Sequence, residues 1–587
     1  MAALLLGACA ALPPYGDPSL QLHRLFEQSD ESSQQRFPMG AIYRGEQRRV
    51  ARFGDFLSDA HVAAGAEAAR SELGALARID RASVSSADRV AYDAFKWQRE
   101  IDLRWSEPAI LAVWLRVPFD QFNGFHLDFT ELSSGTGAAH YRSVEDYDDG
   151  LGRIDGFVAW LGRATARFRE GMETGVVHPR VVVERMIGQF AALVAQGVEG
   201  STFYGPIRSM PLDIAPAERE RLEKAYGAAI RERILPAFVR MHDFLMHEYL
   251  PRARTSAGLS QIPGGAAYYR HLIEVHTTTR MTPEEIHALG LAEVARIRAR
   301  MEEIRTRTGF SGTLAQFFEH VRTDARFKAA SAEAMAEGYR AIGARVHAAL
   351  PRLFSRLPKT ALEIRPEPAY RERTAAAGRY EAGAGDAARP GIFYFSAWDL
   401  PSRNTTGMES IYLHEAEPGH HLQTSLAREN AGLPRFLRFR WITAYGEGWG
   451  LYAETLGREL GMYEDPYQQF GAYGLEIWRA VRLVVDTGVH AKGWTREQAI
   501  DYLMANSSTG RTDAAVEIER YIAWPAQALA YKIGQLTITR LREKAQAALG
   551  ANFDVRAFHE QVLMTGALPL PVLEAKIDAW IAGQTGR

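Results

Sequence analysis

The segment from His414 to His421 constrains the local backbone more than any other part of this sequence. It reads HEAEPGHH, so three histidines and two glutamates stand close together. In a straight helix, position 421 would return to the face of His414 but roughly 10 Å along the axis, too far for one ion to bridge. Pro418 removes a backbone donor and Gly419 tolerates unusual dihedral angles. We therefore expect the helix to break at Pro418 and Gly419.

The same segment has the residue types of a hydrolytic zinc centre. Such a centre needs neutral nitrogen ligands, an open position for water, and a carboxylate that accepts the proton of that water. His414 is the first candidate ligand and Glu415 the candidate general base. A break in the helix would bring His420 or His421 back to the ion. We favour His420, but the spacing alone leaves His421 open.

A third metal ligand is expected on a neighbouring helix, in the segment GEGWGLYAE at 446–454. Glu447 is the candidate, because the connection after His420 is long enough for a second helix to return alongside. The three glycines of the segment weaken a helix and indicate close approach of backbones at a crowded place. Glu454 lies seven residues later on the same face, where it would orient a histidine ligand.

These two motifs resemble the bacterial family catalogued as domain of unknown function 885, whose marker HExxPGHH precedes a GEGWGLYAE-like segment. Three further segments are similar to the pattern of that family: 259–269 (LSQIPGGAAYY), 482–501 (RLVVDTGVHAKGWTREQAID) and 521–534 (YIAWPAQALAYKIG). More remotely, the arrangement is similar to helical zinc peptidases such as thimet oligopeptidase, angiotensin-converting enzyme and carboxypeptidase Taq. That similarity implies peptide hydrolysis with a glutamate as the downstream ligand.

Other side chains are candidates for stabilising the reaction. His490 follows an apolar run and could donate a hydrogen bond to an oxyanion; it could equally be a buried histidine satisfied by Asp486. Tyr521 and Tyr531 flank Pro525 on an expected kinked helix, and a tyrosine hydroxyl is a common electrophilic partner near a metal-bound carbonyl. The spacing leaves all three roles open.

A further group is expected to bind the substrate. Arg479, Arg482 and Lys532 could hold the terminal carboxylate of a peptide, since a cationic group, and above all a guanidinium fork, suits that geometry. The alternative for each is an ordinary salt bridge. The family resemblance places Tyr268 and Tyr269 near the cleft, after the turn at Pro263.

Charge and hydropathy exclude some partners. The formal net charge is −2 and no long cationic run occurs, so nucleic acid is not an expected partner. No stretch of 18 or more apolar residues predicts a spanning helix. Short peptides are the expected substrates, and the oligomeric state is left open.

The single cysteine is Cys9, at the end of the apolar run Leu4 to Ala8. This run resembles a bacterial lipoprotein signal, in which the cysteine becomes the lipidated first residue. Residues 1–18 would then be signal and tether, and the protein would be anchored on the periplasmic side of a bacterial membrane. The basic segment that usually begins such a signal is missing, so the alternative is a frayed terminus on a cytoplasmic protein.

Helical periodicity dominates the rest of the chain, notably at 217–250 and 283–308. The second segment begins with the capping box Thr282-Pro283-Glu284-Glu285. We expect a mainly α, large helical zincin-like fold with a deep cleft. Its N-terminal helical region (19–255) and metal-site region (256–587) are expected to form one continuous fold.

A short β-sheet is expected beside the metal helix. Its strands are predicted at Leu362–Arg365 and Ile392–Trp398, where aromatic and β-branched residues gather. The segment 371–390 between them is rich in alanine and glycine and is predicted to be a flap. A capping box at Thr406–Glu409 is predicted to start the metal helix, and another at Thr495 with Gln498 to start a later helix.

The leading function is an extracytoplasmic zinc peptidase that acts on short peptides. A zinc hydrolase of a non-peptide amide or ester would use the same metal and ignore peptides. A non-catalytic peptide-binding lipoprotein would break no bond.

Overall fold

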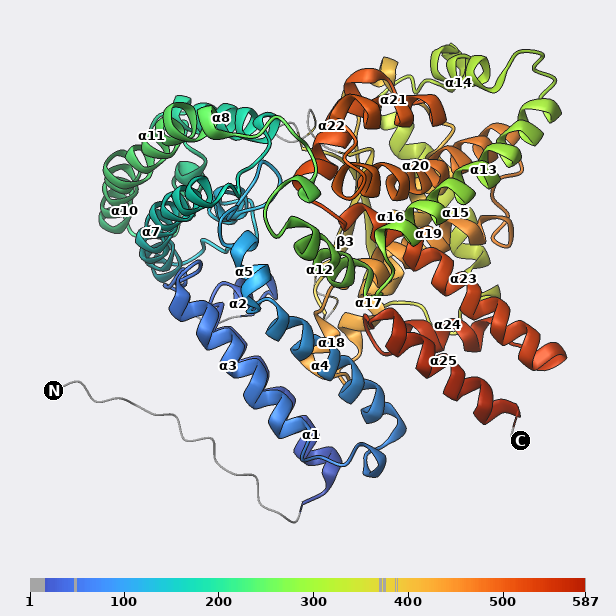
Figure 1. Cartoon of the computed structure of the whole chain (residues 1–587), viewed down its shortest axis with the longest axis horizontal. Coiled ribbons are helices and arrows are strands. Elements are labelled where there is room, and N and C mark those ends of the chain that lie inside the picture. The colour runs from blue at the N-terminus through green and yellow to red at the C-terminus, as the bar shows by residue number, and fades with distance from the viewer. Residues whose placement is uncertain are drawn as a thin grey trace.

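The computed structural model describes residues 16–46, 50–368, 372, 376–385, 387 and 389–585, and most of them are helical. Figure 1 shows one group of helices around α7 and α11, a second larger group around α20 and α23, and the long helices α1, α3 and α4 along one side. The first part of the chain contains α1 (Pro18–Arg36), α2 (Gly40–Tyr43), α3 (Asp59–Leu76), α4 (Ser86–Arg104), α5 (Pro108–Trp114), α6 (Phe125–Leu132), α7 (Val144–Thr174), α8 (Arg180–Ala195), α9 (Gly205–Arg208), α10 (Pro216–Ala229) and α11 (Leu235–Phe244).

The second part of the chain carries the sheet and the histidine-rich segment. Its helices are α12 (Gly265–Thr277), α13 (Pro283–Arg307), α14 (Leu314–Thr323), α15 (Ala332–Ala349), α16 (Met408–Glu415), α17 (His420–Glu429), α18 (Arg435–Arg438), α19 (Thr443–Thr455), α20 (Pro466–His490), α21 (Arg496–Asn506), α22 (Arg511–Ala523), α23 (Ala530–Leu549), α24 (Val555–Leu563) and α25 (Leu570–Thr585).

The strongest helical patterns in the sequence are confirmed. α13 begins with the predicted capping box, in which Thr282 and Glu285 satisfy each other's backbone N–H groups. The Thr495 and Gln498 box at the start of α21 is confirmed in the same way. The segment predicted at 217–250 is helical throughout, but wide π turns at Ile230–Ile234 and Leu245–Tyr249 interrupt the regular α-helical hydrogen bonding.

The capping box predicted at Thr406–Glu409 is wrong. Gly407 caps α16 without any side-chain hydrogen bond. The Glu409 carboxylate instead accepts a hydrogen bond from the backbone N–H of Tyr463 at 2.7 Å and pairs with Arg345 at 3.2 Å. Two partners distant in sequence therefore outcompete the local cap.

A three-stranded sheet lies beside α16, in the order β1-β3-β2. Its strands are β1 (Leu362–Pro366), β2 (Gly378–Glu381) and β3 (Gly391–Phe395). β1 pairs with β3 in parallel and β2 pairs with β3 antiparallel. The strand predicted at Leu362–Arg365 is confirmed, and the one predicted at Ile392–Trp398 is present but ends earlier, at Phe395.

β2 corrects the predicted flap at 371–390. Part of that segment lies outside the described residues, but Gly378–Glu381 is a paired strand. Arg379 accounts for this, because its guanidinium donates to Glu367 at 2.6 Å and stacks on Tyr394 at 4.0 Å. These contacts lie far apart in the sequence, so local composition does not reveal the strand.

Both parts of the chain share one hydrophobic core. The largest cluster of buried apolar side chains includes Phe157 and Trp160 of α7 together with Val294 of α13, Val484 of α20 and Ile518 of α22. The cluster therefore contains residues from both sides of position 255, where the two predicted regions meet. Within the described part of the chain, no helix has the length and apolar character needed to cross a membrane.

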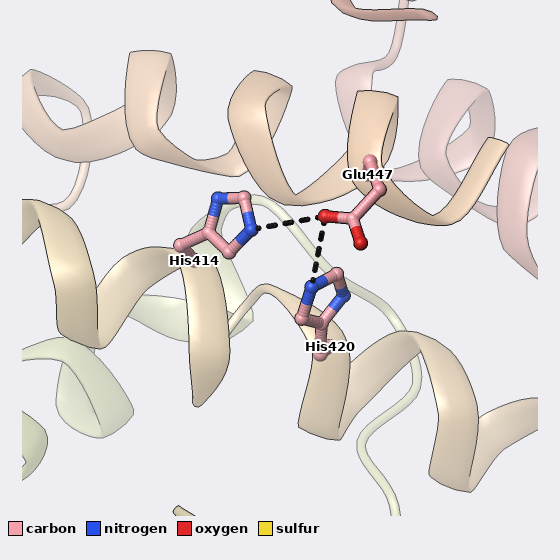
Figure 2. A group of neighbouring side chains, drawn as sticks. All are labelled: His414, His420 and Glu447. Carbon is pink, nitrogen blue, oxygen red and sulfur yellow. Dashed lines mark ion pairs between the residues drawn. The ribbon is translucent and has the colours of Figure 1, made fainter. Parts of the chain in front are cut away.

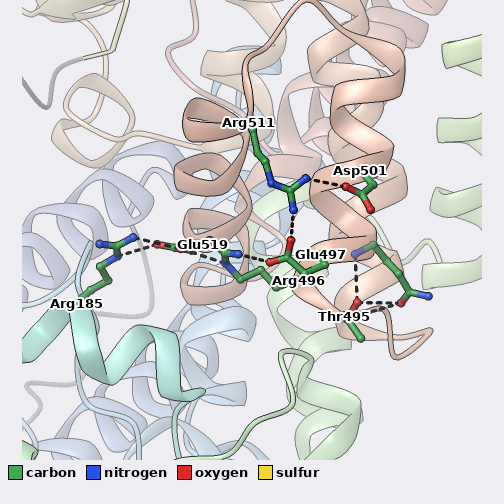
Figure 3. Close-up of polar contacts among 8 residues, drawn as sticks. Arg185, Thr495, Arg496, Glu497, Asp501, Arg511 and Glu519 are labelled. Carbon is green, nitrogen blue, oxygen red and sulfur yellow. Dashed lines mark hydrogen bonds and ion pairs between the residues drawn. The ribbon is translucent and has the colours of Figure 1, made fainter.

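Charged contacts also join the two groups of helices (Figure 3). Glu519 of α22 is buried and accepts from Arg185 of α8 at 2.9 Å and from Arg496 of α21 at 2.6 Å. Arg511 continues the chain of contacts to Glu497 and Asp501. A single buried carboxylate thus fixes α8, α21 and α22 together.

Candidate metal centre

The predicted break in the histidine-rich segment is confirmed between α16, which ends at Glu415, and α17, which starts at His420. A Cβ atom at Gly419 would lie 1.8 Å from the carbonyl oxygen of His414, so only glycine fits there. The Trp449 indole N–H donates to the Pro418 carbonyl at 2.9 Å. Helix α19 thereby holds the break in place.

This break brings His420 next to His414. Glu447, on α19, faces both histidines: its Oε2 lies 3.5 Å from Nε2 of His414 and 3.5 Å from Nε2 of His420 (Figure 2). One donor atom from each of the three residues lies within 4.8 Å of the others, and the three could hold a metal ion.

The donor set fits zinc. A tetrahedral zinc ion about 2.1 Å from its ligands holds them roughly 3.4 Å apart, close to the two distances to Glu447. Two imidazoles and one carboxylate also leave the fourth position to water, as in catalytic zinc sites.

Glu454 orients His414 from the other side. Its Oε1 lies 2.8 Å from Nδ1 of His414, while Oε2 accepts from the Ser410 hydroxyl. With the Nδ1 proton directed to Glu454, Nε2 is the nitrogen that would bind a metal, in place of a proton. Burial alone would lower the pKa of His414, but contacts with Glu447 and Glu454 raise it to about 9.

Electrostatics favour a cation at this point. Burial opposes ionisation of Glu447, yet the contacts with His414 and His420 hold its pKa well below the ordinary range. The carboxylates of Glu447 and Glu454 therefore flank the imidazole of His414 on both sides, and positive charge there, whether a proton or a metal ion, is stabilised.

The glycines of the 446–454 segment allow the close packing that the sequence indicated. A Cβ at Gly450 would lie 2.8 Å from the His414 ring, and one at Gly446 would clash with Trp441. A Cβ at Gly448 would lie 2.5 Å from the Cα of Gly534 on α23. Helix α19 is thus pressed against α16 on one face and α23 on another.

His421 points to the sheet instead of the three-residue group. Its Nδ1 lies 3.1 Å from the Tyr380 hydroxyl on β2, and a Cβ at Gly391 would contact the same nitrogen. Burial lowers the pKa of His421 to about 4. The geometry therefore favours His420 over His421 as a metal ligand.

Glu415 is half-buried beside this group. No hydrogen bond or ion pair joins its carboxylate to any described residue. β2 starts next to it, because a Cβ at Gly378 would lie 3.3 Å from Cγ of Glu415. An unpaired carboxylate adjacent to a ligand is free to accept a proton from water.

The structure does not bring His490 to the three-residue group. The backbone N–H of Leu259 lies 3.3 Å from His490 Nδ1, and the Tyr521 carbonyl lies 2.9 Å from Nε2. Both ring nitrogens are thus engaged with the backbone. Asp486, the partner that the sequence suggested, accepts instead from the Tyr269 hydroxyl and the Ala526 N–H.

The two tyrosines differ in their surroundings. The Tyr521 hydroxyl accepts from Nε of Arg482 at 3.0 Å. Tyr531 lies on α23, three residues before Gly534, which packs against Gly448 beside Glu447. Burial and then the negative charge of Glu447 raise the pKa of Tyr531. Tyr531 is therefore the better placed of the two.

Three of the predicted substrate-binding residues, Lys532, Tyr268 and Tyr269, have close partners within the protein. The two arginines lack a close carboxylate. Lys532 is fully buried and contacts Glu476 at 2.7 Å and Glu293 at 2.9 Å, so it already has its counter-ions. Tyr268 packs edge-on against Trp105, and Tyr269 is bound to Asp486. Arg479 reaches Glu454 only at 3.9 Å, and Arg482 reaches a carboxylate only at 3.9 Å.

Three supporting residues were not predicted: Ser410, Trp441 and Trp449. Ser410 stands four residues before His414, so the helical repeat places both on one face toward Glu454. Trp441 packs edge-on against His420 at 5.4 Å and is 48% exposed. Trp449 lies inside the glycine-rich motif, and its role depends on a backbone carbonyl that no sequence pattern reports.

The fold and the site define a large, mainly helical protein with two histidines and a glutamate that could hold a metal ion. The chain matches the family described as Bacterial protein of unknown function (DUF885) over residues 38–577, and it belongs to that family.

Two solved structures are similar to this chain. A predicted lipoprotein from Colwellia psychrerythraea is 27% identical, with a TM-score of 0.86 over 97% of this chain and 100% of its own. A predicted lipoprotein of unknown function from Shewanella oneidensis is 17% identical, with a TM-score of 0.69 over 94% and 99%, and it supports the fold alone. No curated protein matches the chain.

Proposed function

We propose that this protein is a zinc-dependent peptidase that hydrolyses short peptides. The observation that carries the proposal is the arrangement of His414, His420 and Glu447 around one point, with the unpaired carboxylate of Glu415 beside it. When bound there, zinc would make a water molecule nucleophilic at neutral pH and polarise a carbonyl group.

Glu415 is proposed as the general base. Its carboxylate would take the proton from the attacking water and pass it to the leaving amine. Glu454 would keep the His414 ring in the tautomer whose Nε2 is a ligand. Tyr531 would donate a hydrogen bond to the oxyanion, since a phenol is protonated at neutral pH.

Mass spectrometry of a mixed library of short peptides tests this proposal. We expect the zinc-loaded protein to cleave peptides and Glu415→Gln to lose at least about 10³-fold in kcat while it keeps one zinc per chain. Glu464→Gln is the matched control, because Glu464 is exposed and outside the site. Undiminished cleavage by Glu415→Gln would overturn the assignment of the base.

Metal content separates binding from chemistry. His420→Ala and Glu447→Gln are expected to lose zinc, whereas His421→Ala is expected to retain it, as measured by elemental analysis after dialysis. Zinc loss only in His421→Ala would exchange the roles of the two histidines. Stoichiometric zinc without cleavage of any peptide would favour a non-peptide amide or ester, or a binding role.

We also propose that the chain is a lipoprotein on the periplasmic side of a bacterial membrane. Support comes from the similar Colwellia psychrerythraea protein, which is described as a lipoprotein, and from the apolar run that ends in Cys9, which lies outside the described residues. Growth with an alkyne-tagged fatty acid should label the wild type and leave Cys9→Ser unlabelled. Equal labelling of the two proteins would contradict the proposal that Cys9 carries a lipid anchor.

A further inference from the structure

Arg482, on α20, is a buried cation without a close counter-ion. Its side chain is only 5% exposed, and its ion-pair partner among the described residues, Glu517, lies 3.9 Å away. Nε donates to Tyr521, but Nη1 has no hydrogen-bond partner among the described residues. A buried guanidinium with an unused donor is costly unless a ligand completes it.

A second unused donor lies against the same guanidinium. The Trp478 ring centroid is 4.8 Å from Cζ of Arg482, and its buried indole N–H also has no partner among the described residues. Residues 478 and 482 stand one helical turn apart, on one face of α20. The Tyr531 ring covers the guanidinium at 4.5 Å. Aromatic faces stabilise the cation, but they leave these N–H groups unsatisfied.

Arg482 shares its nearest carboxylate with a second arginine. Arg520 pairs with Glu517 at 3.2 Å, closer than Arg482 does. Two guanidinium groups therefore share one carboxylate. An anion bound here would give Arg482 a close counter-ion and would accept hydrogen bonds from the unused N–H groups.

This cluster adjoins the metal group. The Tyr531 ring covers Arg482, and helix α23, which carries Tyr531, packs against α19 where Gly448, next to Glu447, meets Gly534. Arg479, three residues before Arg482 on the same helix, faces Glu454 at 3.9 Å. The rings of Trp478 and Tyr531 are only partly buried, so this side of the cluster reaches the solvent.

We propose that Arg482 and the indole N–H of Trp478 bind the terminal carboxylate of the substrate, so that the enzyme trims peptides from their carboxyl end. This inference rests on the proposed peptidase function. A planar carboxylate matches the guanidinium fork and would supply the close negative charge that Arg482 lacks.

A pair of substrates tests the inference without any mutation. The zinc-loaded wild type is given one peptide as the free acid and as its carboxyl-terminal amide. We expect kcat/KM to be about 10- to 100-fold higher for the acid, the effect of a charge-assisted hydrogen bond. Equal values for acid and amide would overturn the inference and leave the peptidase function intact.

Substitutions at Arg482 test whether this residue causes the preference for the free acid. Arg482→Met is expected to remove the preference for the acid through a rise in KM, and Arg482→Lys is expected to keep part of it. Arg458→Met is the control, because Arg458 is an exposed arginine remote from this cluster in the chain. Thermal unfolding checks that each variant is folded. An unchanged preference in a folded Arg482→Met protein would overturn the assignment.

Binding measured by calorimetry keeps the two proposals distinguishable. The catalytically blocked Glu415→Gln protein is titrated with an N-acetylated dipeptide acid, its amide and inorganic phosphate. Selective binding of the acid supports the carboxylate site even if no peptide is ever cleaved, in which case the peptidase proposal alone fails. Equal binding of the acid and the amide, or phosphate binding as tight as that of the acid, would overturn the carboxylate assignment.

Discussion

Asp486 shows at the scale of a residue how burial changes a titration. Its carboxylate is fully buried and accepts from the Tyr269 hydroxyl and the Ala526 N–H. Burial raises its pKa to about 7, although both hydrogen bonds act in the opposite direction. The native protein therefore binds a proton between about pH 4 and 7 that the unfolded chain releases.

This titration predicts a pH dependence of stability. Because the unfolded state binds fewer protons in this window, the free energy of unfolding contributed by Asp486 falls as the pH rises from about 4 to 7, by roughly 2–4 kcal/mol. Asp486→Asn cannot titrate and should show a flatter profile in urea unfolding at several pH values. Parallel profiles for the two proteins would show that Asp486 ionises normally.

Residue types with strong chemistry could be predicted from sequence alone. Glu447 and Glu454 lie next to His414, as their helical spacing suggested. His420 was favoured over His421, but the spacing did not decide between them, because the choice depends on the dihedral angles of the break. His490 illustrates the other limit: its partners are backbone groups of Leu259 and Tyr521, which have no sequence signature.

The break between α16 and α17 is the decisive feature at the scale of elements. Gly419→Ala would place a methyl group 1.8 Å from the His414 carbonyl oxygen. We expect it to lower the free energy of unfolding by at least about 2 kcal/mol and to impair zinc binding. Denaturant unfolding and metal analysis measure the two effects.

Gly474→Ala is the matched control, because no atom lies within 4 Å of a Cβ at that position of α20. It should leave zinc binding unchanged and stabilise the helix by up to about 1 kcal/mol. Equal behaviour of the two variants would contradict the packing explanation for Gly419.

Elements with local signals were predicted well, and those set by distant contacts were not. The caps of α13 and α21 lie within four residues of sequence and were correct. β2 depends on the contacts of Arg379 with Glu367 and Tyr394, and it was missed. The same competition explains the false capping box, since Glu409 serves Tyr463 and Arg345.

At the scale of the whole molecule, Glu519 connects helices from both parts of the chain (Figure 3). Its carboxylate is buried and accepts from Arg185 and Arg496. Glu519→Gln should lower the free energy of unfolding by about 1–3 kcal/mol, because charge-assisted bonds to a buried group are lost. Urea unfolding measures the change.

An exposed pair provides the comparison. Arg180 and Glu184 lie 3.1 Å apart on the surface of α8, each about half exposed. Glu184→Gln should change stability by less than about 0.5 kcal/mol. If Glu519→Gln and Glu184→Gln lower the free energy of unfolding by the same amount, burial of Glu519 does not strengthen its contacts.

The three candidate ligands come from α16, α17 and α19, on both sides of a break and a connecting segment. An ion bound by all three would therefore act as a covalent-like cross-link that closes the chain between 414 and 447 into a loop. This sequence has one cysteine, so no disulfide can form within it to provide such a constraint. Because a closed loop has less conformational entropy when unfolded, metal loading should protect this stretch from proteolytic cleavage as well as supply chemistry.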